Sequence, residues 1–287
     1  MPKPFARERS GSKNLPQAEP ARSQAVVRER QLRYFRRADS WFNRFVKLLL
    51  GVHEGLWLGC LNPDELNAIT AEHYEGSRES ASQEHNLRGL FDWELRSVNR
   101  FFPPGSRVLV AAAGGGREVL ALRRSGYVAE GFECNPALVE ASNAMFAELG
   151  EPSGVMLCPP DQVFAGPYLY GGVIIGWTAY SHMPTRERRV EFLRALRELI
   201  SLESPVLLSF FTRDGTSHYD TVVYRMATLT RAVVHGRKEP LEIGDHLNWS
   251  FSHWFTREEI EAELREAGIR LVHFGEVGDG HAVGIVE

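Results

Sequence analysis

Apolar residues recur every three or four positions from about Gln24 to Phe102, the spacing of amphipathic helices. Asn62-Pro63-Asp64 is a second helix start, because proline suits the first turn of a helix. A further helix is expected from about Glu84 to Val98, before the break at residues 102–105 (Phe-Pro-Pro-Gly). We therefore predict a helical N-terminal extension over residues 24–104.

After that break, short apolar runs of strand length alternate with helical segments. The expected strands are 107–112, 127–134, 154–158, 171–177, 205–211, 269–274 and 281–286, and the expected helices are 117–124, 136–149, 185–200 and 256–268. Such alternation predicts a parallel sheet with right-handed crossovers. Residues 105–287 are thus expected to form an α/β domain, with a seven-stranded, mostly parallel Rossmann-like sheet and helices on both faces.

The alternation fails between Ser217 and Ser252. An amphipathic stretch with Tyr219 and Met226 is followed there by a polar segment with Gly236 and Pro240. We interpret residues 217–252 as an inserted helix and loop after the fifth strand that covers the substrate.

Charge is unevenly distributed along the chain. The residues up to Lys47 carry twelve basic and four acidic side chains, whereas the remainder carries 21 basic and 33 acidic ones. An acidic main domain argues against a nucleic-acid substrate, which needs a positive face. Residues 1–23 lack apolar periodicity and are expected to be a disordered tail. This basic tail could bind an anionic partner, but we favour a solubilising role.

Cysteine usage and hydropathy indicate a protein of the reducing cytoplasm without a transmembrane segment. Cys60, Cys134 and Cys158 are odd in number and form no CxxC pair, which excludes a disulfide framework and a cysteine zinc site. No signal peptide is visible. The most apolar stretch, from Phe45 to Leu61, is too short and too charged to span a bilayer. It could lie on a membrane surface, but we expect it to pack on the main domain.

The strongest chemical signal is a glycine-rich turn between the first expected strand and the next helix. Gly114, Gly115 and Gly116 let the backbone approach a nucleotide, and the free N–H groups of the helix start face the ligand. Glu133 closes the next strand, nineteen residues after Gly114, where a carboxylate can accept both hydroxyl hydrogens of an adenosine ribose. A tight turn without a ligand, and a solvated or capping acid, are the structural alternatives. We favour ligand binding because the order and spacing agree.

Dinucleotide enzymes use a similar turn and acid. The third glycine of their GxGxxG pattern would stand at position 119, where this chain has Val119. An NAD-dependent oxidoreductase is therefore the second hypothesis.

From Arg107 to Glu287 the chain resembles the class I S-adenosylmethionine (SAM) dependent methyltransferases. The resemblance rests on the glycine turn and on Glu133, which matches the ribose-binding acid of the family. Ala112 stands where the family commonly has an acidic residue. The resemblance implies SAM as cofactor, S-adenosylhomocysteine as product, and a SAM-dependent methyltransferase activity.

Further residues of the site follow from the same resemblance. Asp161 matches the position that contacts the adenine amino group, although a helix N-cap is an equal alternative. The segment from Glu72 to Arg78 is similar to a loop that closes over SAM, with Tyr74 as a contact and Arg78 near the carboxylate of the methionine part. The other positions expected to bind SAM lie beside these elements: Cys134, Gln162 and Trp177.

The segment after the fourth strand bears on the acceptor. It reads Gly-Trp-Thr-Ala-Tyr at 176–180, without the Asn/Asp-Pro-Pro-aromatic sequence of enzymes that methylate base amines and without a cysteine nucleophile. A small-molecule or peptide O or N acceptor is the better interpretation.

Methyl transfer requires alignment of acceptor and methyl group, and a protic acceptor also needs a base. His182 is the candidate base, at the carboxyl edge of the sheet where open α/β folds bind ligands, and Tyr180 is expected to orient the acceptor. A helix-capping histidine is the alternative for His182. His246 and His253 are weaker candidates, and His281 is expected to be structural. No acidic cluster has metal-binding spacing. A third hypothesis is a non-catalytic SAM-fold scaffold protein that uses its basic arm.

Overall fold

The structure is a computed structural model that describes residues 19–75, 82–160, 162–164, 167–234, 240–276 and 280–287. The chain divides into two compact units, Met1–Leu49 and Leu50–Glu287. This division differs from the boundary near residue 104 that the sequence predicted, because the helices between residues 63 and 101 belong to the second unit. Asp161, Arg78 and residues 1–18 lie outside the described part of the chain.

A single helix, α1 (Glu19–Cys60), runs through the predicted extension. It begins at Glu19, so the last residues of the segment expected to be disordered are helical. No proline occurs between Pro20 and Pro63, so nothing interrupts the backbone hydrogen-bond ladder. Within the described residues, no helix combines the length and the apolar character that crossing a membrane requires.

Three shorter helices lead into the sheet: α2 (Pro63–Glu75), α3 (Gln83–Asn86) and α4 (Asp92–Phe101). The Asn62 side chain caps α2, accepting hydrogen bonds from the backbone N–H groups of Asp64 and Glu65, both at 3.0 Å. Pro63 occupies the first turn, as the sequence predicted.

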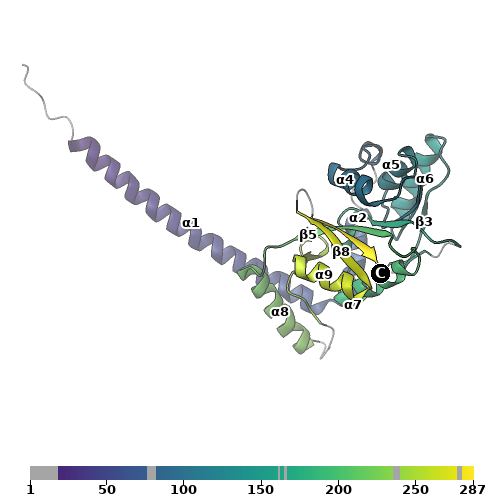
Figure 1. Cartoon of the computed structure of the whole chain (residues 1–287). Coiled ribbons are helices and arrows are strands. Elements are labelled where there is room, and N and C mark those ends of the chain that lie inside the picture. The colour runs from purple at the N-terminus through teal and green to yellow at the C-terminus, as the bar shows by residue number, and fades with distance from the viewer. Residues whose placement is uncertain (1–18, 76–81, 161, 165–166, 235–239, 277–279) are drawn as a thin grey trace, which may run out of the picture. The chain divides into compact units, whose positions relative to one another are not determined.

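The sheet confirms the predicted fold class (Figure 1). Its seven main strands are β1 (Arg107–Ala111), β2 (Val128–Glu133), β3 (Val155–Leu157), β4 (Gly172–Ile175), β5 (Pro205–Thr212), β8 (Ile269–Gly275) and β9 (Gly280–Val286). The first five are parallel in the order β3-β2-β1-β4-β5. Strand β9 pairs antiparallel with both β5 and β8. The crossovers carry the helices α5 (Arg117–Arg124), α6 (Pro136–Glu148), α7 (Arg186–Arg197) and α9 (Arg257–Glu266).

Helices cover both faces of this sheet, because buried strands alternate their side chains between two apolar layers. In β1, Leu109 and Ala111 pack in the layer of α7 and α9. Val108 and Val110 of the same strand pack with α4, α5 and α6. Figure 1 shows these two groups of helices apart from one another on either side of the strands.

The segment after β5 differs from the expected helix and loop. It contains helix α8 (His218–Val234) and two antiparallel strands, β6 (Asp245–Leu247) and β7 (Phe251–Phe255). Strand β7 pairs with Phe211 and Thr212 at the end of β5. Over the described residues the sheet therefore has nine strands rather than the expected seven. The sequence Phe-Ser-His-Trp-Phe of β7 has large apolar residues at 251, 254 and 255, so it lacks the strict alternation that would mark a short strand beside the polar segment before it.

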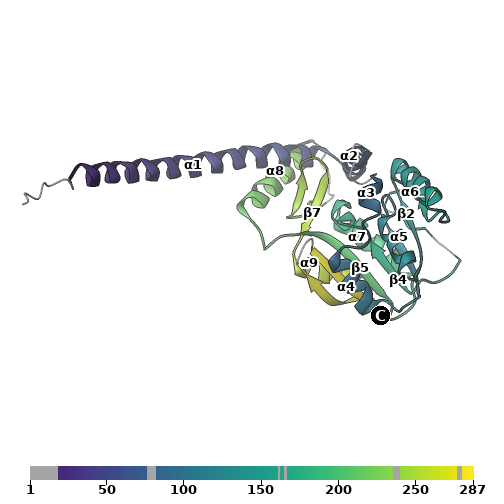
Figure 2. The same ribbon diagram turned by 90° about the horizontal axis from the view of Figure 1, so that it is seen from above.

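The C-terminal part of α1 packs closely on α8 through glycines spaced four residues apart, Gly51, Gly55 and Gly59 (Figure 2). A Cβ atom at Gly55 would lie 2.5 Å from the Val223 carbonyl oxygen, and one at Gly59 would lie 2.5 Å from the Ala227 carbonyl oxygen. Glycine is thus required at both positions, because the neighbouring atoms belong to the α8 backbone.

We expect Gly55→Ala and Gly59→Ala each to destabilise the protein by about 1–3 kcal/mol through overpacking. Gly51→Ala is the matched control, since its added methyl would meet only side-chain atoms of Val222 and Tyr219, at 3.1 Å or more. Helix propensity then makes it neutral or stabilising by up to about 1 kcal/mol. Urea unfolding measures all three, and equal tolerance of the three substitutions would contradict the close crossing.

Candidate functional site

The glycine turn lies at the carboxyl end of β1, and the side chain of Glu133 is directed onto it. One carboxylate oxygen accepts the N–H of Gly114 at 2.9 Å. The other accepts the N–H groups of Cys134 and Asn135 at 2.8 and 2.9 Å. The Cys134 thiol also lies 3.4 Å from this second oxygen. The first oxygen accepts only from Gly114, so it keeps acceptor capacity for one further donor.

The turn has the backbone that a ligand cradle requires. Gly114 and Gly116 adopt positive φ angles of 52° and 88°, which favour glycine. A Cβ atom at Gly114 would have no atom within 4 Å, whereas one at Gly116 would meet Ser142 and Phe146. Helix α5 starts after Gly116 without a side-chain cap, so its N-terminus suits an anionic group. These residues fit an adenosyl ligand with a carboxylate end.

A buried arginine, Arg117, anchors the start of α5. Its guanidinium donates two hydrogen bonds to the Glu94 carboxylate, both at 2.7 Å, and one to Glu118 at 2.6 Å. It also donates to the Gly89 carbonyl at 2.9 Å. Sequence reasoning missed this anchor, although a basic residue in the first turn of a helix opposes the helix dipole and so indicates a local acidic partner.

The side chain of Asn86 is a second feature that the sequence did not reveal. Asn86 is buried and lies directly against Gly115, where a Cβ atom would collide with its amide. Next to it, the His85 ring stacks on Trp177 with centroids 5.9 Å apart. Phe91 meets the same indole edge-on at 5.2 Å. The predicted residue Trp177 thus lies near the turn and remains 40% exposed.

Tyr74 and His182 are brought together, as two of the predicted site residues. The Tyr74 hydroxyl lies 2.9 Å from Nε2 of His182, and Nδ1 of His182 lies 2.7 Å from the Phe251 carbonyl oxygen. A carbonyl only accepts, so Nδ1 carries the hydrogen, and Nε2 accepts the hydrogen bond from Tyr74.

Ionisation agrees with this assignment. Burial lowers the pKa of His182, which keeps the imidazole neutral. Burial and the nearby charge of Glu133 raise the pKa of Tyr74 to about 12, so the phenol keeps its proton. Glu133 is thus close enough to affect the ionisation of Tyr74, so the glycine turn and the Tyr74–His182 pair belong to one site.

The loop after β4 is fixed at several points. Thr178 adopts a positive φ of 55°, which strains a β-branched residue. Its N–H donates to the Ser209 hydroxyl at 2.8 Å, and the Ser181 hydroxyl accepts from the N–H of Phe211 at 2.8 Å. These contacts determine where His182 lies.

Tyr180 does not face the same space as His182. Its side chain is fully buried and its hydroxyl donates to Glu263 at 2.6 Å. Burial and the charge of Glu263 raise its pKa well above the ordinary value. The 3-10 turn at Ala179–His182 directs this ring into the core. Tyr180 therefore anchors the loop to the core and does not orient an acceptor, in contrast to the prediction from the sequence.

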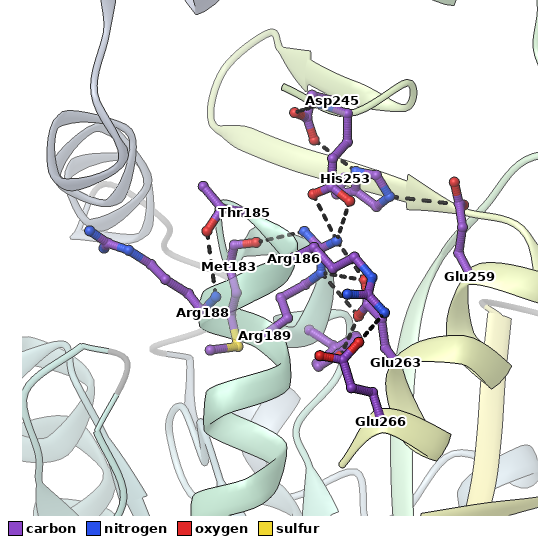
Figure 3. A network of polar contacts seen from close by, with 12 residues as sticks. Met183, Thr185, Arg186, Arg188, Arg189, Asp245, His253, Glu259, Glu263 and Glu266 are labelled. Atoms are coloured by element: carbon purple, nitrogen blue, oxygen red, sulfur yellow. Dashed lines mark hydrogen bonds and ion pairs between the residues drawn. The ribbon is translucent and has the colours of Figure 1, made fainter. Parts of the chain in front are cut away.

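Glu263 belongs to a buried network centred on Arg189 (Figure 3). The Arg189 guanidinium donates to Glu263 at 2.7 Å and to Glu242 at 2.9 Å, and its side chain is fully buried. The network joins α7, α9 and the segment before β6. Through Tyr180, it also holds the loop that carries His182.

One group of side chains has the spacing of metal ligands among the described residues. Potential ligand atoms of Glu242, Asp245 and His253 lie within 4.8 Å of one another. Glu242 is already paired with Arg189, and Asp245 accepts from Nδ1 of His253 at 2.7 Å. The guanidinium supplies positive charge to Glu242, and Asp245 is held by His253 and by the N–H of Glu242 at 2.8 Å, so we assign the group a structural role.

The other predicted residues are distributed around the site or away from it. Cys134 is exposed and follows Glu133, and Gln162 is also exposed. His246 lies between Glu54 and Asp220, at 3.0 and 3.3 Å. His281 stacks on Trp93 with centroids 4.8 Å apart, and its structural role stays a prediction.

Comparison with known proteins shows what this architecture is. No family model and no curated protein matches the chain, but solved structures do. The chain has the class I SAM-dependent methyltransferase fold. A SAM-dependent methyltransferase from Methanosarcina mazei aligns with a TM-score of 0.53 and 13% identity, covering 69% of this chain and 100% of that one.

Two further methyltransferase structures share this fold. The sugar N-methyltransferase KedS8 from Streptoalloteichus aligns with a TM-score of 0.52 and 15% identity, over 71% of this chain and 90% of that one. The 1,6-didemethyltoxoflavin-N1-methyltransferase from Burkholderia thailandensis gives a TM-score of 0.52 and 16% identity, over 79% and 92%.

We expect Arg189→Met to destabilise the protein by about 3–5 kcal/mol, because it leaves Glu263 buried without its charge partner. Arg186→Met is the matched control from the same helix. Arg186 pairs with Glu266 at the surface, with both side chains more than a third exposed, so its loss is expected to cost at most about 1 kcal/mol. Denaturant unfolding compares the two, and similar small losses would show that the network does not hold the loop.

Proposed function

We propose that this protein is a SAM-dependent methyltransferase that acts on a small-molecule or peptide O or N acceptor. The observation that carries the proposal is the Glu133 carboxylate bonded to the N–H of Gly114. This contact brings Glu133, the acid that we propose to bind the ribose, next to an uncapped helix start. The fold agrees with the same activity.

The ligand would be held by residues of the two adjoining turns. Glu133 would accept from a ribose hydroxyl, and the backbone of Gly114 to Gly116 would face the methionine part. Trp177 and Tyr74 would flank the ligand, with Cys134 and Gln162 beside the adenosine. Asp161 and Arg78 remain predicted contacts from the sequence. When bound, SAM supplies a methyl group activated by a sulfonium.

His182 would receive the proton of the acceptor. Its neutral imidazole presents Nε2 as an acceptor, and the Phe251 carbonyl holds the other nitrogen in the N–H form. In this structure the Tyr74 hydroxyl donates to Nε2. The proton of the acceptor would therefore reach Nε2 either by way of the Tyr74 hydroxyl or directly, after a small shift of the Tyr74 ring. The fixed loop would align the acceptor, which is the main task of the enzyme in a direct displacement.

Two observations disfavour the NAD-dependent oxidoreductase. Val119 stands where the dinucleotide motif needs a glycine, and it is fully buried against Gly131. In addition, β9 lies antiparallel between β5 and β8, whereas the dinucleotide fold continues with parallel strands. Solved neighbours that act on a sugar and on 1,6-didemethyltoxoflavin support a small acceptor.

Calorimetry should detect S-adenosylhomocysteine binding in the micromolar range, and thermal shift should distinguish it from NAD, which should not stabilise the protein. We expect Glu133→Ala to weaken S-adenosylhomocysteine binding at least tenfold, because a hydrogen bond to a charged group contributes about 1.5–3 kcal/mol. Glu140→Ala, which removes an exposed carboxylate from the following helix, is the matched control and should bind normally.

Other outcomes of these measurements would favour one of the two alternative functions. Stabilisation by NAD and not by S-adenosylhomocysteine would favour the oxidoreductase. Tight S-adenosylhomocysteine binding without methyl transfer to any of a broad set of acceptors would favour a non-catalytic scaffold.

A further inference from the structure

The first unit presents an exposed apolar stripe along α1. Residues 35, 38, 42, 45 and 49 follow the three- and four-residue spacing of one helix face. Large side chains dominate this face and its edges, and their exposed fractions range from 43% to 68%: Phe35, Trp41, Phe42, Phe45, Leu48 and Leu49. A soluble helix normally buries such a stripe, so it indicates an interaction surface.

The opposite face of the same helix is predominantly basic. Residues 28–49 contain seven basic and two acidic side chains, a net charge of +5. The two acids are engaged locally, Glu29 with Arg33 and Asp39 with Asn43. Within the described part of the chain, four basic side chains of this face form no ion pair: Arg36, Arg37, Arg44 and Lys47.

A second copy of the chain would be a poor partner for this helix. Two such helices, paired through their apolar stripes, would direct their basic faces away from one another, so this partner would leave the basic charge without a counterpart. Of the positions beside the seam, Trp41, Val46 and Leu48 are apolar and Asp39 is charged, whereas paired helices commonly use oppositely charged pairs there to choose partners. The core positions are three phenylalanines, an alanine and Leu49, so only Leu49 is a branched aliphatic residue of the kind that stable coiled coils use.

A lipid surface fits both faces at once. Aromatic and leucine side chains enter the boundary between headgroups and acyl chains, while basic residues reach lipid phosphates and carboxylates. The long arginine and lysine stems can extend toward the headgroups from a helix that lies flat. We propose that residues 28–49 of α1 bind the surface of a bilayer that contains anionic lipids. This inference is independent of the proposed methyltransferase activity.

Sedimentation of the full chain with vesicles tests the proposal. One set of vesicles is phosphatidylcholine alone, and the other contains roughly one-third phosphatidylserine, whose charge attracts basic segments. We expect binding to the anionic vesicles and much weaker binding to the neutral ones. Added salt should weaken the anionic binding, because it screens the basic face.

Two sets of substitutions separate the faces. The triple change Phe35→Ser, Phe42→Ser and Phe45→Ser should abolish binding. The triple change Arg36→Gln, Arg37→Gln and Arg44→Gln should weaken it about a hundredfold, from roughly fivefold per charge. Ser40→Gln with Asn43→Gln, on the polar face, is the control and should bind as the unchanged chain does. An unchanged melting temperature of the second unit verifies folding.

Three results would overturn the proposal. They are no binding to anionic vesicles, equal binding to both kinds of vesicle, and loss of binding in the control. Sedimentation velocity without vesicles adds a fourth. If the chain does not bind vesicles but forms a dimer, and the phenylalanine substitutions abolish that dimer, the stripe is an interface with a second copy.

Discussion

The site depends on one carboxylate that receives three backbone N–H groups. Glu133 ends β2, and its bonds to Gly114, Cys134 and Asn135 join this strand end to the turn after β1. Strands β1 and β2 are hydrogen-bonded neighbours, with Ala111 paired to Phe132. The register of the sheet therefore determines that Glu133 lies beside the glycine turn. A side chain of another length would not make the same three contacts.

Buried charges fix the parts that surround this contact. Arg117 binds Glu94 and Glu118 behind the glycine turn, and Arg189 binds Glu242 and Glu263 beneath the loop of His182. Each arginine has two acidic partners, so neither leaves an isolated charge in the core. Such networks contribute little net stability, but their directional bonds hold the two loops at defined positions. The strained φ of Thr178 is consistent with a loop held by its surroundings.

The features that the sequence could predict are those encoded within one short segment. The glycine turn, Glu133 and the order of strand and helix follow from local spacing, and the fold class was confirmed. The strands β6 and β7 were missed, since β7 becomes a strand through its pairing with Phe211 and Thr212, some forty residues earlier. Tyr180 stands only two residues before His182 but points to Glu263, because the 3-10 turn places the two side chains in different directions. Asn86 reaches Gly115 only through the packing of α3 on α5.

The account is tested most directly by a crystal structure of the full chain grown with S-adenosylhomocysteine. It predicts a ribose hydroxyl within hydrogen-bond distance of the Glu133 carboxylate, with the amino-acid end of the ligand over Gly114. Density for the ligand elsewhere, or a Glu133 side chain turned away from the sugar, would contradict the central claim.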